Sequence, residues 1–597
     1  MINNTLKIYF LTIMALATTA YAADNFLSPT QIISGSAGQK LYISEQSANQ
    51  VAVFDIATKQ VVNIATPGSP SGLALSPDGS TLYVAIASAD GKLCKINIAT
   101  NTITATYPVG HTPTAIVASP DGQKVYIANR FGNTISIYDT SANAIETVSV
   151  IREPFDLAIT PDSSKLVVAN FLPDGSAVNA SYISAKVSLI NTVSKAVTNI
   201  ALPNGSTLVC GTCISPDGNF AYITHLLGRY QLPTNQIERG WIITNAMSII
   251  DLQTDNLIGT ILLDDVDLGA ANPWDITTDA DGLNLYITHA GTHEISIINR
   301  QGIHQKLSTS TNPERDLGFM AKVARQRIAT KVKGPRGVAI ADGKVWVTGY
   351  FSTDISSIDL AVKGKDQVKT YSLGTEPAMT DARRGYLLYN DADICFQKWL
   401  SCASCHPDGR NDALNWDELN DGFGNAKQTK SHLYSHQTPP TTITGCRPNA
   451  ETSVRAGLLY AYFQIRPADE AVAIDEYLKA LRPVPSPRLV NGQLSASALR
   501  GKAIYDGSAN CAVCHNGPYL TDMKLHNVGT GSGRHAGTKF DTPTLKEIWR
   551  TAPYLYDGRA ATISDVLTTY NQGDAHGATS QLTEDQLTDL VEYIMSL

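Results

Sequence analysis

The sequence predicts a multidomain protein in which an all-β propeller is followed by a mainly α-helical region. Three observations predict this arrangement. Seven related β-rich segments recur between residues 30 and 375, and the β alternation stops after about residue 376. The last third then carries two copies of the pattern Cys-x-x-Cys-His, each preceded by a helical run. A chain of 597 residues is also too long for one ordinary core.

The seven segments each combine a turn with an alternating strand. Asp-Gly or Pro-Asp sets the turn, and β-branched and aromatic residues favour the strand. The segments are "SAGQKLYIS" (36–44), "SPDGSTLYVA" (76–85), "SPDGQKVYIA" (119–128), "TPDSSKLVVA" (160–169), "SPDGNFAYIT" (215–224), "DADGLNLYIT" (279–288) and "ADGKVWVTG" (341–349). The first copies are about 40 residues apart, which indicates four strands per unit, as in a propeller blade. Seven copies therefore predict a seven-bladed β-propeller over 30–375. The repeat sequences resemble those of the YVTN/YncE-like propeller family.

Longer spacings between later repeats place insertions near 173–186, 225–246 and 300–332. Insertions in a regular propeller gather on one face and often meet a partner, so we expect some of them to contact the C-terminal region. His225 and His289 each follow a "YIT" strand end. They are either surface histidines or a metal-binding pair on one face.

The N-terminus has the pattern of a secretory signal peptide. One Lys precedes an apolar run from Ile8 to Ala17, and Ala20-Tyr21-Ala22 gives a small-x-small cleavage site. We expect cleavage after Ala22, no membrane span, and a periplasmic or extracellular protein. The formal net charge of −8 argues against a nucleic-acid partner.

Cys-x-x-Cys-His is the attachment signature of c-type haem, which is attached outside the cytoplasm. Two thiols one helical turn apart add to the haem vinyl groups, and the adjacent His binds the iron. The motifs contain Cys402, Cys405 and His406, and then Cys511, Cys514 and His515. They predict two covalently bound haems c, with His406 and His515 as proximal iron ligands.

Five cysteines remain outside the motifs. Cys210 and Cys213 are interpreted as a short structural disulfide, although their spacing also resembles a redox dithiol. Cys395 and Cys446 flank the first motif and could pair. Cys94 is left over, because an odd number cannot pair completely within the chain.

The C-terminal region resembles the di-haem bacterial cytochrome c peroxidases and the MauG-like proteins. The run "FDTPTLKEIWRTAPYLYDGRAATISDVLTTYNQGDAHG" (540–577) and the run "GPYLTDMKLHNVGTG" after the second motif carry this resemblance. It covers roughly 385–597. It implies two cytochrome c-like haem domains, at 385–490 and 491–597, with the first half more divergent. The tryptophan that this family often has between its two haems is missing near Ile443. Trp416 and Trp549 are the two alternatives for its role in electron transfer between the haems.

The resemblance also implies roles for single residues. The first haem would react with peroxide or oxygen, with Glu451 as the catalytic acid–base group and Arg455 beside it. His432 or His436 could be a displaceable sixth ligand there. Tyr570 occupies the place of the second axial ligand of the His515 haem; the alternative is a core tyrosine with methionine or nothing on the iron. Calcium would bind near Thr542 and Pro543.

Together these features predict an exported di-haem oxidoreductase. Peroxide or oxygen reacts at the first haem, electrons pass through the second, and the propeller docks a partner or substrate protein. A redox partner protein or a small electron donor would supply electrons. Two alternatives stay open: a non-catalytic electron-transfer cytochrome with the propeller as its binding module, and a propeller whose own pocket is the active site.

Overall fold

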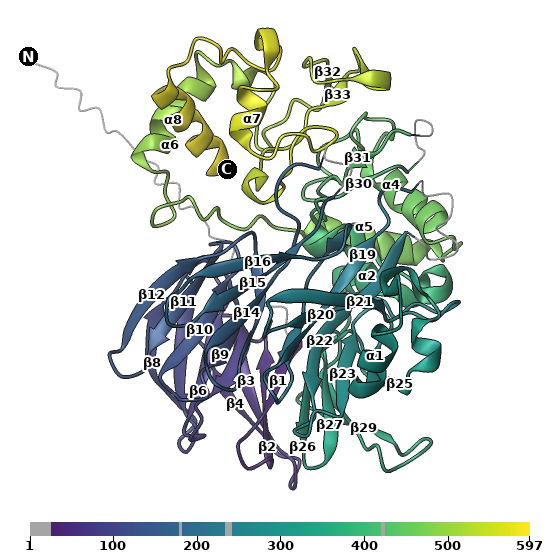
Figure 1. Cartoon of the computed structure of the whole chain (residues 1–597). Helices are drawn as coiled ribbons and strands as arrows, with labels where there is room; N and C mark the ends of the chain where they lie inside the picture. Colours follow the sequence, from purple (N-terminus) through teal and green to yellow (C-terminus); the bar gives the residue numbers. More distant parts are fainter. Residues whose placement is uncertain (1–25, 178–181, 233–241, 419–423) are drawn as a thin grey trace, which may run out of the picture.

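The computed structural model describes residues 26–177, 182–232, 242–418 and 424–597. Within them, seven antiparallel sheets follow one another along the chain and form a closed propeller, and a helical region lies across one face of it (Figure 1). The sequence-predicted fold class, a seven-bladed propeller followed by a helical cytochrome c region, is confirmed. The expected signal peptide, 1–22, lies outside the described residues.

Each of the first four blades is one four-stranded sheet. Blades one and two contain β1 (Pro29–Ser34), β2 (Lys40–Glu45), β3 (Gln50–Asp55), β4 (Val61–Ala65), β5 (Pro70–Leu75), β6 (Thr81–Ile86), β7 (Lys92–Asn97) and β8 (Thr102–Pro108). Blades three and four contain β9 (Pro113–Ala118), β10 (Lys124–Asn129), β11 (Thr134–Asp139), β12 (Ala144–Ser149), β13 (Pro154–Ile159), β14 (Lys165–Asn170), β15 (Lys186–Asn191) and β16 (Val197–Ala201).

The longer insertions lie in blades four, five and six. Blade five has five strands: β17 (Ser206–Thr207), β18 (Thr212–Ile214), β19 (Phe220–Gly228), β20 (Ile243–Asp251) and β21 (Asn256–Leu262). Blades six and seven contain β22 (Pro273–Thr278), β23 (Asn284–His289), β24 (Glu294–Asn299), β25 (Arg325–Ala329), β26 (Pro335–Ala341), β27 (Lys344–Gly349), β28 (Asp354–Ile358) and β29 (Val368–Ser372). Helix α1 (Arg300–Leu307) lies between β24 and β25.

The ring closes where the last blade meets the first. Strand β26 packs against β1, and the Thr348 hydroxyl donates to the Thr30 carbonyl oxygen at 2.9 Å. A Cβ on Gly337 would come within 2.6 Å of that same carbonyl oxygen, so a side chain there would push the two strands apart. In each blade the second and third strands are buried between neighbouring sheets and the fourth is largely exposed, which explains the alternating hydrophobic runs.

The helical region repeats one arrangement twice. Its elements are α2 (Asp381–Asn390), α3 (Cys402–Cys405), β30 (Asn415–Trp416), β31 (Lys427–Gln428), α4 (Ala450–Ala456), α5 (Ala468–Ala480), α6 (Ala496–Asp506), β32 (Leu525–His526), β33 (Phe540–Asp541), α7 (Ile563–Leu567) and α8 (Glu584–Met595). Helix α2 crosses α5, and α6 crosses α8. At both crossings a glycine allows backbone contact: a Cβ on Gly385 would meet the Ala473 oxygen at 1.8 Å, and one on Gly501 would meet the Asp589 oxygen at 1.8 Å.

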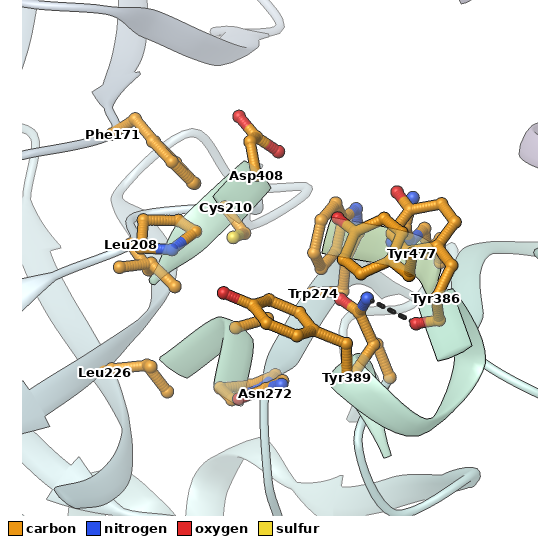
Figure 2. A pocket seen from close by; sticks show the side chains of 16 residues that line it. Phe171, Leu208, Cys210, Leu226, Asn272, Trp274, Tyr386, Tyr389, Asp408 and Tyr477 are labelled. Carbon is orange, nitrogen blue, oxygen red and sulfur yellow. Dashed lines mark hydrogen bonds between the residues drawn. The ribbon is translucent and has the colours of Figure 1, made fainter. Parts of the chain in front are cut away.

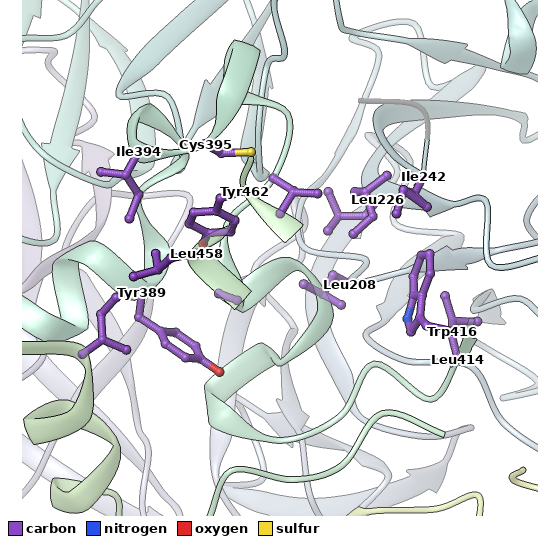
Figure 3. Packing of buried hydrophobic residues seen from close by; sticks show 14 of the residues in the cluster. Leu208, Leu226, Ile242, Tyr389, Ile394, Cys395, Leu414, Trp416, Leu458 and Tyr462 are labelled. Atoms are coloured by element: carbon purple, nitrogen blue, oxygen red, sulfur yellow. The ribbon is translucent and has the colours of Figure 1, made fainter. Parts of the chain in front are cut away.

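The first haem unit shares its hydrophobic core with the propeller. Leu208, Leu226 and Ile242 of the propeller belong to one buried cluster with Tyr389 and Leu458 of the helical region (Figure 3). The second unit has a separate cluster built from its own residues. The first unit and the propeller are therefore one packed body, because no solvent layer separates their apolar surfaces.

The insertions partly reach the helical region, as the sequence predicted. The Ala177 amide donates to the Gly558 carbonyl oxygen at 2.8 Å, and the Ser176 hydroxyl donates to the Arg559 carbonyl oxygen at 2.9 Å. Gly228, at the end of the long β19, lies against the Leu414 and Trp416 side chains. The insertion at 300–332 instead packs on the propeller through α1 and the buried Phe319.

Two expectations about cysteines are wrong. No two of the nine cysteines are joined by a disulfide in this structure. Cys210 packs in the core shared with the first haem unit, whereas Cys213 packs against the core between blades five and six, so the two side chains point into different clusters. Cys395 is buried and Cys446 is exposed, and they do not pair.

The propeller histidines are neither surface residues nor a metal pair. His225 and His289 are fully buried. His225 bonds the Leu226 carbonyl oxygen and the Ser248 hydroxyl at 2.9 and 2.8 Å, and His289 bonds the Ala270 carbonyl oxygen and the Ser296 hydroxyl at the same two distances. Both ring nitrogens of each histidine are occupied, which leaves none for a metal ion.

Candidate haem sites

The first Cys-x-x-Cys-His motif forms the short helix α3 and the turn after it. Ser401 and Ser404 make a reciprocal capping box at its start. His406 Nδ1 donates to the Arg410 carbonyl oxygen at 3.1 Å, which leaves Nε2 available as a ligand. Burial lowers the pKa of His406, so the ring is neutral as iron ligation requires. The two thiols and this oriented imidazole fit a covalent haem.

A second histidine lies beside this proximal ligand. The rings of His432 and His406 stack with centroids 3.8 Å apart. The Tyr389 hydroxyl bonds His432 Nδ1 at 2.8 Å and also reaches the His406 carbonyl oxygen at 3.3 Å. A stacked ring lies alongside His406 and cannot bind the opposite face of the same iron. His432 therefore shapes the surroundings of His406, and its expected role as a displaceable ligand is wrong.

A charge network surrounds the turn after His406, in which Asp408 is 43% exposed and its arginine partners are buried. The Asp408 carboxylate lies 2.8 Å from Arg130 of the propeller and 3.1 Å from Arg550 of the second haem unit. Arg130 also pairs with Glu153 at 2.9 Å. Although burial raises the pKa of Asp408, the two guanidinium groups outweigh burial and the net pKa is far below its usual value. The network fixes this turn to both neighbouring parts of the molecule.

Arg410 links the first motif to the second haem unit. Its guanidinium makes a two-pronged contact with Glu547, with Nε–Oε2 and Nη2–Oε1 distances of 2.6 and 2.9 Å. Both side chains are almost fully buried. Because the Arg410 carbonyl oxygen also accepts from His406, the proximal histidine of the first site is held by a residue anchored in the second unit.

The second motif lies between α6 and the loop that follows it. His515 Nδ1 donates to the Leu520 carbonyl oxygen at 3.2 Å, again leaving Nε2 for iron. The Tyr505 hydroxyl donates to the His515 carbonyl oxygen at 2.5 Å. The donor set matches that of the first motif, so these residues also fit a covalent haem.

His576 faces the second motif and was missed from the sequence. Its ring centroid lies 6.3 Å from that of His515. Burial, together with His515, lowers the pKa of His576 to about 4. The available signal was its position, six residues after Tyr570 in the same loop and next to Gly577.

The expected acid–base pair is separated by other contacts. Arg455 binds Asp475 at 2.5 Å and donates to the Glu451 carbonyl oxygen rather than to its carboxylate. Asp475 also contacts His436 at 3.0 Å. A different carboxylate, Glu418, acts electrostatically on His406. No motif in the sequence pointed to this residue.

Three aromatic residues named from the sequence lie as follows. Tyr570 is half-buried against the core of the second unit, with the Arg559 guanidinium 5.9 Å from its ring centroid. Trp549 packs edge-on against Phe131 of the propeller, with centroids 5.1 Å apart. Trp416 donates to Asp412 at 2.8 Å in the shared core. Both tryptophans thus contribute to docking between the propeller and the haem units.

A small cavity lies between the propeller and the first motif. Its volume is about 30 Å³, room for roughly one water molecule. Figure 2 shows that Cys210, Asn272 and Trp274 of the propeller meet Tyr386 and Asp408 of the first haem unit around it. This space is far too small for a substrate protein, so a protein that docks on the propeller must use another surface.

One cluster outside the motifs has metal-ligating residue types. The ligand atoms of His293, Asp391 and Asp393 lie within 4.8 Å of one another. His293 Nδ1 accepts from the Gly334 amide at 3.0 Å, so the neutral ring carries its proton on Nε2. That nitrogen lies 3.3 Å from Asp391 and is not available to a metal. The cluster joins the propeller to the haem region. The calcium ion expected near Thr542 stays a prediction.

Two family models match the chain. A lactonase model, described as a seven-bladed β-propeller, matches residues 84–194, and a cytochrome c model matches residues 498–597. Fold, motifs and matches together define a c-type cytochrome built onto a propeller, with at least one c-type haem.

The chain is also similar to subunits of one enzyme. It is 30% identical over 272 residues to hydrazine synthase subunit gamma of Kuenenia stuttgartiensis, covering 36% of this chain and 77% of that subunit. The chain belongs to the family of that subunit. Subunit beta from the same organism is 29% identical over 241 residues, covering 38% of this chain and 60% of that subunit. A solved structure of Kuenenia stuttgartiensis hydrazine synthase aligns with a TM-score of 0.53 and 26% identity over 58% of this chain and 99% of that chain.

The resemblance to peroxidases and MauG is confirmed. Cytochrome-c peroxidase IdrP1 of Denitromonas iodatirespirans is 31% identical over 153 residues, covering 17% of this chain and 41% of that protein. Methylamine utilization protein MauG of Methylorubrum extorquens is 23% identical over 277 residues, covering 36% of this chain and 76% of that protein. The chain spans less than half of the peroxidase. No described helix combines the length and the apolar character that a membrane crossing needs.

Proposed function

We propose that the protein is an exported di-haem oxidoreductase that reduces peroxide or oxygen at the first motif and receives electrons through the second. Each peroxide would take two electrons and two protons and yield two water molecules. A small electron donor or a redox partner protein supplies the electrons. The haem groups, when bound, supply the iron centres that accept and pass single electrons.

The difference between the two motifs carries this proposal. His576 lies across from His515 at 6.3 Å. Among the residues that the structure describes, the imidazole ring in contact with His406 is that of His432, which is stacked beside it. One site thus has a second imidazole in place and the other does not. An open position on the iron is what a reacting oxidant requires.

The connection between the motifs supports electron transfer. Arg410 bonds His406 through its carbonyl oxygen and Glu547 through its guanidinium. The contact between Arg410 and Glu547 is buried, so the first motif keeps a fixed relation to the second haem unit. Glu451 remains the proposed acid–base group at the first site, with Arg455 beside it.

Subunits beta and gamma of hydrazine synthase each match this chain. By its name, that enzyme is assembled from subunits. We extend this to a docking role: the propeller would hold a partner or substrate protein near the haem units.

Ligand binding to the reduced holoprotein tests the proposal. We expect one carbon monoxide molecule per chain, and peroxide reduction that is lost in C402A/C405A but not in the C94A control. If the holoprotein with both haems binds no carbon monoxide, protein side chains fill both axial positions of each iron. The protein would then be an electron carrier with the propeller as its binding module.

A further inference from the structure

We infer that His576 is the second axial ligand of the haem attached at the second motif, so that this iron is held by two imidazoles. The inference rests on the proposed relay role of that haem and names the residue that closes it. It replaces Tyr570, the ligand expected from the sequence.

Distance is the first argument. An imidazole nitrogen binds a transition metal at about 2.0–2.1 Å, and the ring centroid lies about 1.1 Å behind that nitrogen. Two imidazoles on opposite sides of one iron therefore place their centroids about 6.2 Å apart. The His515 and His576 centroids are 6.3 Å apart. By contrast, the stacked His406 and His432 rings, at 3.8 Å, leave no room for a metal between them.

The second argument is the state of the ring nitrogens. Within the described residues neither nitrogen of His576 makes a hydrogen bond, and Nδ1 is shielded from solvent without a partner. A buried polar nitrogen without a partner is unfavourable, so such atoms are uncommon unless something other than the protein chain satisfies them. The buried propeller histidines show the contrast, because both of their nitrogens are bonded.

The third argument is that the loop holds His576 in place. The His576 amide donates to Asn571 Oδ1 at 2.7 Å, and Asn571 Nδ2 donates to the Gly577 carbonyl oxygen at 2.7 Å. The Ala578 amide donates to the Ala509 carbonyl oxygen at 3.0 Å, two residues before Cys511. The loop is thus tied to the haem motif itself.

Gly577 makes this close approach feasible. Its φ of +94° is unfavourable for other residues, and a Cβ there would lie 3.0 Å from the Ala509 carbonyl oxygen and 3.9 Å from Cys511 Sγ. The residue next to His576 must therefore be small for the loop to lie against the motif.

The other candidates for the second axial ligand lie in less suitable positions than His576. Tyr570 lies against the core of the second unit, beside Arg559. The sulfur of Met595 lies 3.9 Å from the Tyr554 hydroxyl. Met523 is 38% exposed. Two imidazoles would also give the second haem a lower reduction potential than a His–Met pair, which suits an electron relay rather than an oxidant site.

Electron paramagnetic resonance of the oxidised holoprotein tests the inference. We expect the wild type to show one low-spin signal of bis-imidazole type and one high-spin signal. In H576A the low-spin equivalent should become high-spin, and added imidazole should restore it. Y570F and H526A should keep the wild-type spectrum; His526 is a matched control because it lies in the same unit and is paired with Asp522 at 2.8 Å.

An unchanged low-spin signal in H576A, or its loss in Y570F, would overturn the assignment. If H576A does not mature with two haems, H576M supplies the second test: the low-spin centre should persist, gain a thioether-to-iron charge-transfer band and rise in potential. A bis-imidazole signal still present in H576M would equally overturn the inference. A holoprotein that binds no carbon monoxide would overturn the proposed function whatever the H576A spectrum shows. An unchanged low-spin signal in H576A would overturn this ligand while one bound carbon monoxide still supported an open first haem.

Discussion

The two Cys-x-x-Cys-His sites share a pattern and a helix pair, yet their surroundings differ. The first unit lies in one hydrophobic core with the propeller, while the second unit has a core of its own. The first proximal histidine has another histidine stacked beside it, and the second has one across from it. A motif therefore fixes haem attachment, but the residues packed around it decide whether the iron is open or closed. The predictions below test this contrast, from the largest expected effect to the smallest.

Removing the thiols of one motif should remove one haem. We expect C402A/C405A and C511A/C514A each to retain one covalent haem instead of two, because the thioether bonds cannot form. Intact-protein mass spectrometry checks the count. C94A, a buried thiol in the propeller, should keep two haems. One haem in the wild type would contradict the di-haem proposal.

Neutralising Glu547 should weaken the junction between the sites. E547Q would leave the buried Arg410 guanidinium without its carboxylate partner and Arg550 with Asp408 alone. Breaking one side of a buried ion pair costs about 3–5 kcal/mol of unfolding free energy. Denaturant unfolding measures this, and E476Q, in an exposed pair with Lys479, should show no measurable loss. Equal stability of the two variants would mean that the buried network is not what joins the units.

Core truncations should separate the two units. Leu414 belongs to the core shared with the propeller and Leu590 to the core of the second unit, and both are fully buried. Each change to alanine should cost about 2–5 kcal/mol. L414A should lower the unfolding temperature of the propeller and the first haem unit together. L590A should lower the unfolding temperature of the second haem unit. Calorimetry combined with haem absorbance measures both unfolding temperatures. If both variants showed the same single shift, the two cores would not unfold separately.

Acid should destabilise the propeller through its buried histidines. Burial lowers the pKa of His225 to about 4, below the ordinary value of about 6.5. The unfolded chain therefore binds this proton first, and stability falls by about 1.4 kcal/mol per pH unit as pH drops from about 6.5 to about 4. The slope of the unfolding free energy against pH, measured across this range, should be smaller in H225Q by the equivalent of one proton. An identical slope in both proteins would show that His225 does not titrate in this way.

Much of the fold followed from local sequence. The turn-and-strand repeats predicted seven blades because each blade forms from consecutive residues with period-two alternation. The helices before each motif were also predictable, as was contact between some of the insertions and the C-terminal region. The expected disulfides failed because the spacing of Cys210 and Cys213 does not say into which core each side chain points. The buried state of His225 and His289 was likewise invisible, because strand-end histidines look alike whether a neighbouring region covers them or not.

The sequence by itself predicted the haem-attachment residues and the proximal ligands, since covalent attachment requires those residues at that spacing. Only the tertiary structure brought Arg410 to Glu547, joined the first unit to the propeller and set His576 across from His515. These contacts link residues far apart in the chain. Local pattern cannot specify them, because they depend on how whole elements pack and on which buried polar atoms are left without a partner.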